Sequence, residues 1–221
     1  MGAVSAVAQS ERARLWRWAL ALAVFTVLYN VAEGLVSVLF GLQDETVALV
    51  GFGADSFVEV LSGLGILHML WRLRRNGTAG LDAFEATALR VTAAAFFILA
   101  AALTVAAILG LYQGHVPQST LWGMIVSVVS IATMWALLWG KLRVGRRLGS
   151  DALVADAHCT RACLWLSVVL LASSLGYALT GLGGLDSLGA LGIAWLSLRE
   201  GREALRKARG LGCACQGPCK V

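Results

Sequence analysis

Charged residues are scarce in this chain of 221 residues. Asp, Glu, Lys and Arg make up 14% of it, whereas soluble domains carry about a quarter. This shortage argues against a soluble globular domain. Disorder requires low hydrophobicity and high charge, and a chain that is 58% hydrophobic has the reverse. Proline occurs only twice, which argues against a proline-rich linker protein.

Cysteine is also sparse, with five residues that are odd in number and unevenly placed. Such a set favours free thiols or metal ligands over a disulfide framework. The sequence contains no GxGxxG or P-loop motif and no solenoid repeat. Nucleotide-dependent chemistry therefore has no support in the sequence.

Long apolar stretches fill most of the chain, whose mean hydropathy is +0.76. A helix that crosses a bilayer needs about 20 apolar residues. The sequence predicts an all-α fold, a polytopic membrane protein built as a six-transmembrane helix bundle. The predicted spans are residues 15–41, 46–70, 88–111, 121–142, 152–179 and 185–198.

The basic residues support this division, because they occur in alternate connections. Lys and Arg gather at 12–17, 72–90, 141–147 and 199–220, whereas the other three connections have none. Apart from residues in the first or last three positions of a span, Arg161 alone lies within a span. Positive charge marks cytoplasmic segments, so both termini are predicted to be cytoplasmic. The net charge of +5 is therefore interpreted as a topology signal, not as evidence of nucleic-acid binding. Basic residues on the cytoplasmic side are also expected to contact anionic lipid headgroups.

Three parts of the chain follow from this topology. Residues 1–14 are predicted to be a cytoplasmic N-terminal segment, 15–205 a transmembrane transport domain and 206–221 a cysteine-containing cytoplasmic tail. The N-terminal apolar run continues to Phe40, which is too long for a cleaved signal peptide. The absence of an organellar signal favours a bacterial plasma (inner) membrane.

Two carboxylates lie inside the second span. Asp55 and Glu59 are four residues apart and therefore lie on one helix face. Ionisable residues within a span are costly and mark functional sites. Two carboxylates at this spacing repel unless a cation or a proton lies between them. The pair is therefore predicted to bind a cation, a proton, or each in turn.

The fifth span repeats this spacing with thiols at Cys159 and Cys163. Thiolates suit zinc and other thiophilic metals, although a cysteine pair in a span is about as often simple packing. At a rise of 1.5 Å per residue, Asp55 lies about 14 Å from the start of its span and Cys159 about 11 Å from the start of its own, so both pairs approach the middle of the bilayer. If spans 2 and 5 are neighbours, the four side chains form a tetrahedral site. A structural ion pair with Arg161 is the alternative for the carboxylates.

Further candidate ligands flank these pairs. Asp156 lies one turn before Cys159, and His158 is adjacent to Cys159 but points about 100° away. Glu33 and Asn30 of the first span are candidates to line the same cavity, with Arg161 as the alternative partner of Glu33. The tail carries a separate candidate cluster of soft ligands, which is Cys213, Cys215 and Cys219. That cluster lacks a fourth ligand for a closed zinc site, so a reduced tail without metal is an equal alternative.

The pattern resembles the cation diffusion facilitator family of zinc, cadmium and cobalt efflux transporters. The stretches that carry the resemblance are YNVAEG at 29–34, VALVGFGADSFVE at 47–59, and DALVADAH at 151–158 leading to Cys163. The resemblance implies a transport site made from the Asp55–Glu59 pair and the pair in span 5. The His and Asp that are usual in that family fall at Cys159 and Cys163, which makes a softer site.

The chain departs from the family in a second way. Members commonly carry a cytoplasmic metal-binding domain after the sixth span, and here only about twenty residues follow. A homodimer is therefore expected by analogy alone. The His-rich loop of some members is also absent.

These observations predict a divalent-metal efflux transporter, not an enzyme, that exchanges metal for protons by alternating access. Zn²⁺ is the expected cargo, with Cd²⁺, Co²⁺ and Hg²⁺ open, and no resident cofactor is expected. Two alternatives remain: a membrane metal sensor or buffer without transport, and a thiol-redox protein that uses Cys159 and Cys163.

Overall fold

The computed structural model describes residues 2–76 and 83–209, and these residues form six α-helices. The helices are α1 (Gly2–Gln43), α2 (Val47–Asn76), α3 (Ala83–Gln113), α4 (Leu121–Leu148), α5 (Asp151–Thr180) and α6 (Gly184–Ala208). Each predicted span lies within one of these helices to within one residue. The predicted all-α helix bundle is confirmed.

The helices have the length and composition of an integral membrane protein. Five of them, α1 to α5, are long and apolar enough to cross a bilayer. The sixth, α6, has 25 residues, but Asp186, Arg199 and Glu200 shorten its apolar part. Its predicted span therefore ends at Leu198, and the last two to three turns are polar.

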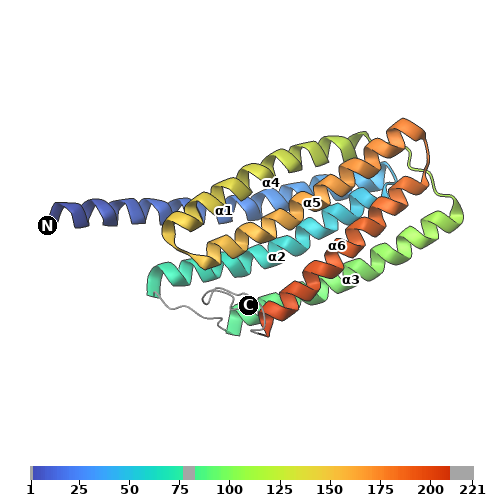
Figure 1. Cartoon of the computed structure of the whole chain (residues 1–221). Helices are drawn as coiled ribbons and strands as arrows, with labels where there is room; N and C mark the ends of the chain where they lie inside the picture. The colour runs from blue at the N-terminus through green and yellow to red at the C-terminus, as the bar shows by residue number, and fades with distance from the viewer. Residues whose placement is uncertain (1, 77–82, 210–221) are drawn as a thin grey trace, which may run out of the picture.

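The helices pack in pairs, with α3 against α6, α1 against α2 and α4 against α5. Helix α2 is central, since it also contacts α3, α5 and α6. The start of α1 extends past the other helices, and the end of α6 lies at the same end of the bundle (Figure 1). Both described ends are thus on one side, as the distribution of basic residues requires.

Small residues allow α1 and α2 to approach closely. A Cβ added to Gly41 would lie 2.7 Å from the backbone nitrogen of Val50, and one added to Gly53 would lie 2.8 Å from the Cβ of Ser37. Close approach through small residues is typical of helix pairs in membranes. The backbone of α1 is therefore held against the first half of α2.

The start of α2 is fixed by α6. The carboxylate of Asp186 accepts hydrogen bonds from the backbone N–H groups of Val47, at 2.8 Å, and Ala48, at 3.3 Å. A carboxylate at a helix N-terminus satisfies free N–H groups and interacts favourably with the helix dipole. Asp186 thereby fixes the start of α6 to the start of α2.

The position of Lys141 corrects the sequence analysis, which counted it among the basic residues of the connection after span 4, although it lies at the end of the predicted span 121–142. Helix α4 continues to Leu148, so Lys141 lies within the helix and is buried. Its Nζ lies 2.9 Å from Oδ2 of Asp156 on α5, and it donates a hydrogen bond to Oγ1 of Thr160 at 2.9 Å. The prediction failed because basic residues near span ends are normally solvated, whereas α5 supplies a buried carboxylate here.

Candidate metal-transport site

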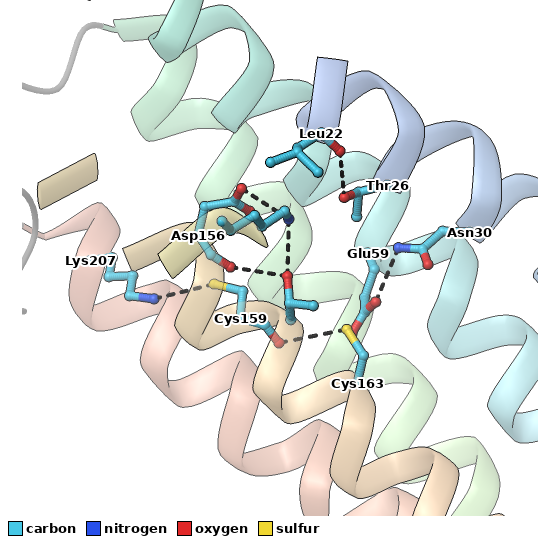
Figure 2. Close-up of polar contacts among 10 residues, drawn as sticks. Leu22, Thr26, Asn30, Glu59, Asp156, Cys159, Cys163 and Lys207 are labelled. Carbon is cyan, nitrogen blue, oxygen red and sulfur yellow. Dashed lines mark hydrogen bonds and ion pairs between the residues drawn. The ribbon is translucent and has the colours of Figure 1, made fainter. Parts of the chain in front are cut away.

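Helices α2 and α5 meet through Glu59 and Cys163. The Cys163 thiol donates a hydrogen bond to Oε1 of Glu59 at 2.6 Å. Oε2 of the same carboxylate accepts from Nδ2 of Asn30 on α1 at 3.2 Å. Figure 2 shows these three side chains together. The expected proximity of spans 2 and 5 is thus found at one carboxylate and one thiol.

The other member of each pair has a different neighbour. Oδ1 of Asp55 accepts a hydrogen bond from the hydroxyl of Ser197 on α6 at 2.7 Å. The Sγ of Cys159 lies 3.6 Å from Nζ of Lys207, also on α6 (Figure 2). Asp55 is buried and Cys159 is partly exposed. Helix α6 therefore reaches both the carboxylate pair and the thiol pair.

The four predicted ligands are not gathered around one point. In the part of the chain that the structure describes, no group of three or more Cys, His, Asp or Glu side chains could hold a metal ion. Asp55 and Cys159 each lie one helical turn, about 5.4 Å, from the Glu59–Cys163 contact. Because α2 and α5 run antiparallel, Asp55 and Cys159 lie on opposite sides of that contact. A four-ligand site would therefore need α2 to slide along α5 by about one helical turn.

Helix α1 supplies the side of the site opposite α6. Asn30 contacts Glu59, and one turn further Oε2 of Glu33 accepts a hydrogen bond from the hydroxyl of Ser56 at 3.1 Å. Both α1 side chains are buried. Glu33 therefore lies beside the carboxylate pair, as the sequence predicted, and its role as an accessory ligand stays a prediction.

The flanking candidates on α5 have other surroundings. The Asp156 carboxylate is paired with Lys141, and the His158 side chain is exposed. Their accessory metal roles also stay predictions. The alternative that Arg161 neutralises the buried carboxylates is wrong, because the Arg161 side chain is exposed and the carboxylates contact Ser197, Asn30, Cys163 and Ser56 instead.

The part of α6 after the predicted span carries both acidic and basic side chains, and it lies near Cys159. Lys207 Nζ lies 2.9 Å from Oε1 of Glu203. Burial raises the pKa of the Glu200 carboxyl to about 6, and the charge of Glu203 adds to the rise. Residues 200–207 of α6 therefore place both negative and positive charges near the Cys159 thiol.

Sequence reasoning missed three polar residues at or beside the site: Ser197, Lys207 and Lys141. Ser197 lies in an apolar stretch, and no spacing signal marks it. Lys207 was read only as a cytoplasmic charge. The tail candidates Cys213, Cys215 and Cys219 lie outside the described residues.

The sequence matches the protein family described as the Cation efflux transmembrane domain over residues 19–210. No curated protein matches the chain. Because the match covers most of the chain, the protein belongs to the cation efflux family, a family of transporters. A helical membrane bundle with buried carboxylates beside a buried thiol agrees with that membership. Metal cations are the substrates that the family implies.

Proposed function

We propose that this protein exports divalent transition-metal ions from the cytoplasm in exchange for protons, with Zn²⁺ as the first candidate cargo. The observation that supports this most directly is the contact between Glu59 of α2 and Cys163 of α5. It joins the two helices that carry the predicted ligands, and it joins an oxygen ligand to a sulfur ligand.

The proposed binding step brings all four ligands to one ion. The metal replaces the proton that the Cys163 thiol shares with Glu59. A movement of α2 along α5 then brings Asp55 from Ser197, and Cys159 from Lys207, to the same ion. Because the ligands must lose protons, metal affinity should rise with pH. Movement of the helices then opens the site outwards, where protons compete for the carboxylates and release the ion.

The thiols make the site softer than one built from histidine and carboxylate. Soft ligands favour Zn²⁺, Cd²⁺ and Hg²⁺ over Mn²⁺ or Mg²⁺. Four ligands of oxygen and sulfur type suit the tetrahedral preference of zinc. The proposed location is a bacterial plasma membrane with both termini in the cytoplasm, and a homodimer is proposed by family analogy.

The test is uptake of Zn²⁺, Cd²⁺, Co²⁺ and Hg²⁺ into proteoliposomes under an imposed pH gradient. We expect gradient-dependent flux in the wild type, and loss of that flux in Asp55→Asn and in Cys159→Ala/Cys163→Ala. The matched control is Cys213→Ala/Cys215→Ala/Cys219→Ala, which removes the tail thiols and leaves the transmembrane ones. Full flux in Asp55→Asn would contradict the site assignment.

The same preparation separates the alternatives. Metal binding without flux for any ion would favour a sensor or buffer. Thiol trapping that shows Cys159 and Cys163 alternating between reduced and disulfide forms during turnover would favour a redox protein.

A further inference from the structure

The candidate site lies where two helix pairs meet, α1 with α2 and α4 with α5. The Cys163 thiol on α5 contacts Glu59 on α2, and Asn30 on α1 contacts the same carboxylate. Within the first pair the helices are in close contact, since a Cβ added to Gly41 would lie 2.7 Å from the backbone nitrogen of Val50. The boundary between the two pairs is therefore the place to look for the route by which an ion leaves the site.

This boundary is polar next to the site, on the side away from the basic residues, which the proposed topology places outside. All four helices contribute a buried polar side chain there: Glu33 on α1, Ser56 on α2, Ser130 on α4 and Ser167 on α5. The Ser56 hydroxyl donates to Glu33 at 3.1 Å, and the hydroxyls of Ser130 and Ser167 are 2.8 Å apart. Carboxylate and hydroxyl oxygens can replace part of the water shell of an ion.

Nearer the outer end, the same boundary is closed by an aromatic stack. Phe40 of α1 and Trp122 of α4 have ring centroids 3.7 Å apart and ring planes inclined by 16°. Both rings are partly buried and pack against the hydrophobic core. An ion loses its hydration at such an apolar contact and gains no ligand in return. The stack therefore has to separate before an ion passes.

The connection between α3 and α4, residues 114–120, lies at the end of the bundle opposite the chain's N-terminus (Figure 1). Its second half is bound to α5. The Tyr177 hydroxyl donates to the carbonyl of Pro117 at 2.7 Å, and the Thr120 hydroxyl donates to the carbonyl of Ser174 at 3.0 Å. This half of the connection thus belongs to the α4–α5 pair.

Gln118 joins this connection to the α1–α2 pair. Its backbone N–H donates to the carbonyl of Asp44 at 3.0 Å, and its Nε2 donates to Oε1 of Glu45 at 2.9 Å. Gln118 and Glu45 are exposed, whereas Pro117 and Thr120 are buried. An exposed hydrogen bond exchanges readily with water, whereas a buried group that loses its partner costs its full desolvation. When the pairs separate, the connection should therefore stay on α5 and release residues 44–45.

The backbone of Glu45 supports a release at this point. Its φ is 55°, in the left-handed region that residues other than glycine rarely adopt. Gln118 holds its side chain, and His115 holds its carbonyl oxygen through Nε2 at 2.8 Å. Strained residues that surrounding contacts keep in place are common in segments that switch conformation. Loss of the Gln118 contact removes one of the two restraints on Glu45.

We propose that Gln118 and the Phe40–Trp122 stack form the outer gate of the transport route, and that the ion leaves when α1–α2 separates from α4–α5 at these contacts. This inference rests on the proposed export of metal. An ion that enters from the cytoplasm binds while the gate is closed, and its release to the outside requires the gate to open. A bond that fixes Gln118 to Glu45 should therefore stop flux and spare binding.

The test is Glu45→Cys/Gln118→Cys in a parent protein without the three tail cysteines, oxidised to a disulfide across the contact. We expect cadmium flux into proteoliposomes to be lost in the oxidised variant and restored by a reductant. Cadmium binding in detergent, followed by the ultraviolet absorbance of cadmium–thiolate bonds, should equal that of the parent. The parent keeps Cys159 and Cys163, is oxidised in parallel and should retain its flux.

The matched control is Thr120→Cys/Ser174→Cys, which fixes the same connection to α5, where the proposal requires no movement. Its oxidised form should transport as its reduced form does. Flux that survives oxidation of Glu45→Cys/Gln118→Cys would overturn the proposal, and so would equal loss in the control or loss of cadmium binding. Should the test variant fail to fold, Asp44→Cys/Gln118→Cys spans the same contact and is judged by the same criteria. A wild type that binds cadmium without flux would contradict the proposed export itself, and the gate with it.

Discussion

Replacing Lys141 with Met should destabilise the bundle strongly. The side chains of Lys141 and Asp156 are 1% and 7% exposed, and Nζ lies 2.9 Å from Oδ2. Removing one member of a buried ion pair costs about 3–5 kcal/mol, because the other charge stays buried without compensation. Thr160 loses its hydrogen bond from Lys141 as well.

The assay is thermal unfolding in detergent, followed by tryptophan fluorescence. For a chain of this size about 1 kcal/mol corresponds to about 2–4 °C, so Lys141→Met should melt about 6–20 °C below the wild type. The double variant Lys141→Met/Asp156→Leu should recover most of this loss, since apolar replacement of a whole buried pair is often neutral. Melting of Lys141→Met at the wild-type temperature, or of the double variant at that of the single one, would refute the reasoning.

Three further outcomes are expected in the same unfolding assay. Asp186→Ala removes the acceptor for two N–H groups at the start of α2 and should cost about 1–2 kcal/mol; an unchanged melting temperature would contradict this capping role. Glu200 has its pKa raised by burial from 4.5 to about 6, so its ionisation opposes folding as the pH rises through that window. Glu200→Gln should therefore be more stable than the wild type above pH 6 and equal to it below pH 4.5, and a difference that grows at low pH would reverse the sign of the argument. Gly189→Val places a side chain against Ser173 of α5 and should cost about 1–3 kcal/mol, whereas wild-type melting would show that α5 and α6 can separate freely.

The helices and the two ligand pairs could be predicted because both depend on local rules. Apolar length determines where a span lies, and a spacing of four residues places Asp55 with Glu59, and Cys159 with Cys163, on one face. The contact between spans 2 and 5 was expected because the two pairs lie at similar depths in the membrane. The structure supports it through the hydrogen bond between Glu59 and Cys163.

The side chains that surround the pairs could not be predicted, because their roles depend on which helix lies opposite. Lys141 looks like a cytoplasmic charge in the sequence, yet the packing of α4 against α5 places it beside Asp156. Ser197 is one small polar residue in an apolar run, and only the packing of α6 brings it to Asp55. Arg161 shows the converse, since a charge within a span proved to be exposed.

The attachments of α6 to α2 have a mechanical consequence. Asp186 holds the start of α2, and eleven residues later Ser197 holds Asp55, so the two helices are joined at points about 16 Å apart along α6. Two attachment points at this separation oppose both sliding and tilting of one helix against the other, so α2 and α6 move as one rigid unit. Helices α4 and α5 are likewise joined at two points, by the ion pair of Lys141 with Asp156 and by the hydrogen bond from Ser167 to Ser130, and form a second rigid unit. Glu59 of α2 and Cys163 of α5 lie where the two helix pairs meet. An ion bound by both residues would therefore stabilise one angle between the two pairs over others.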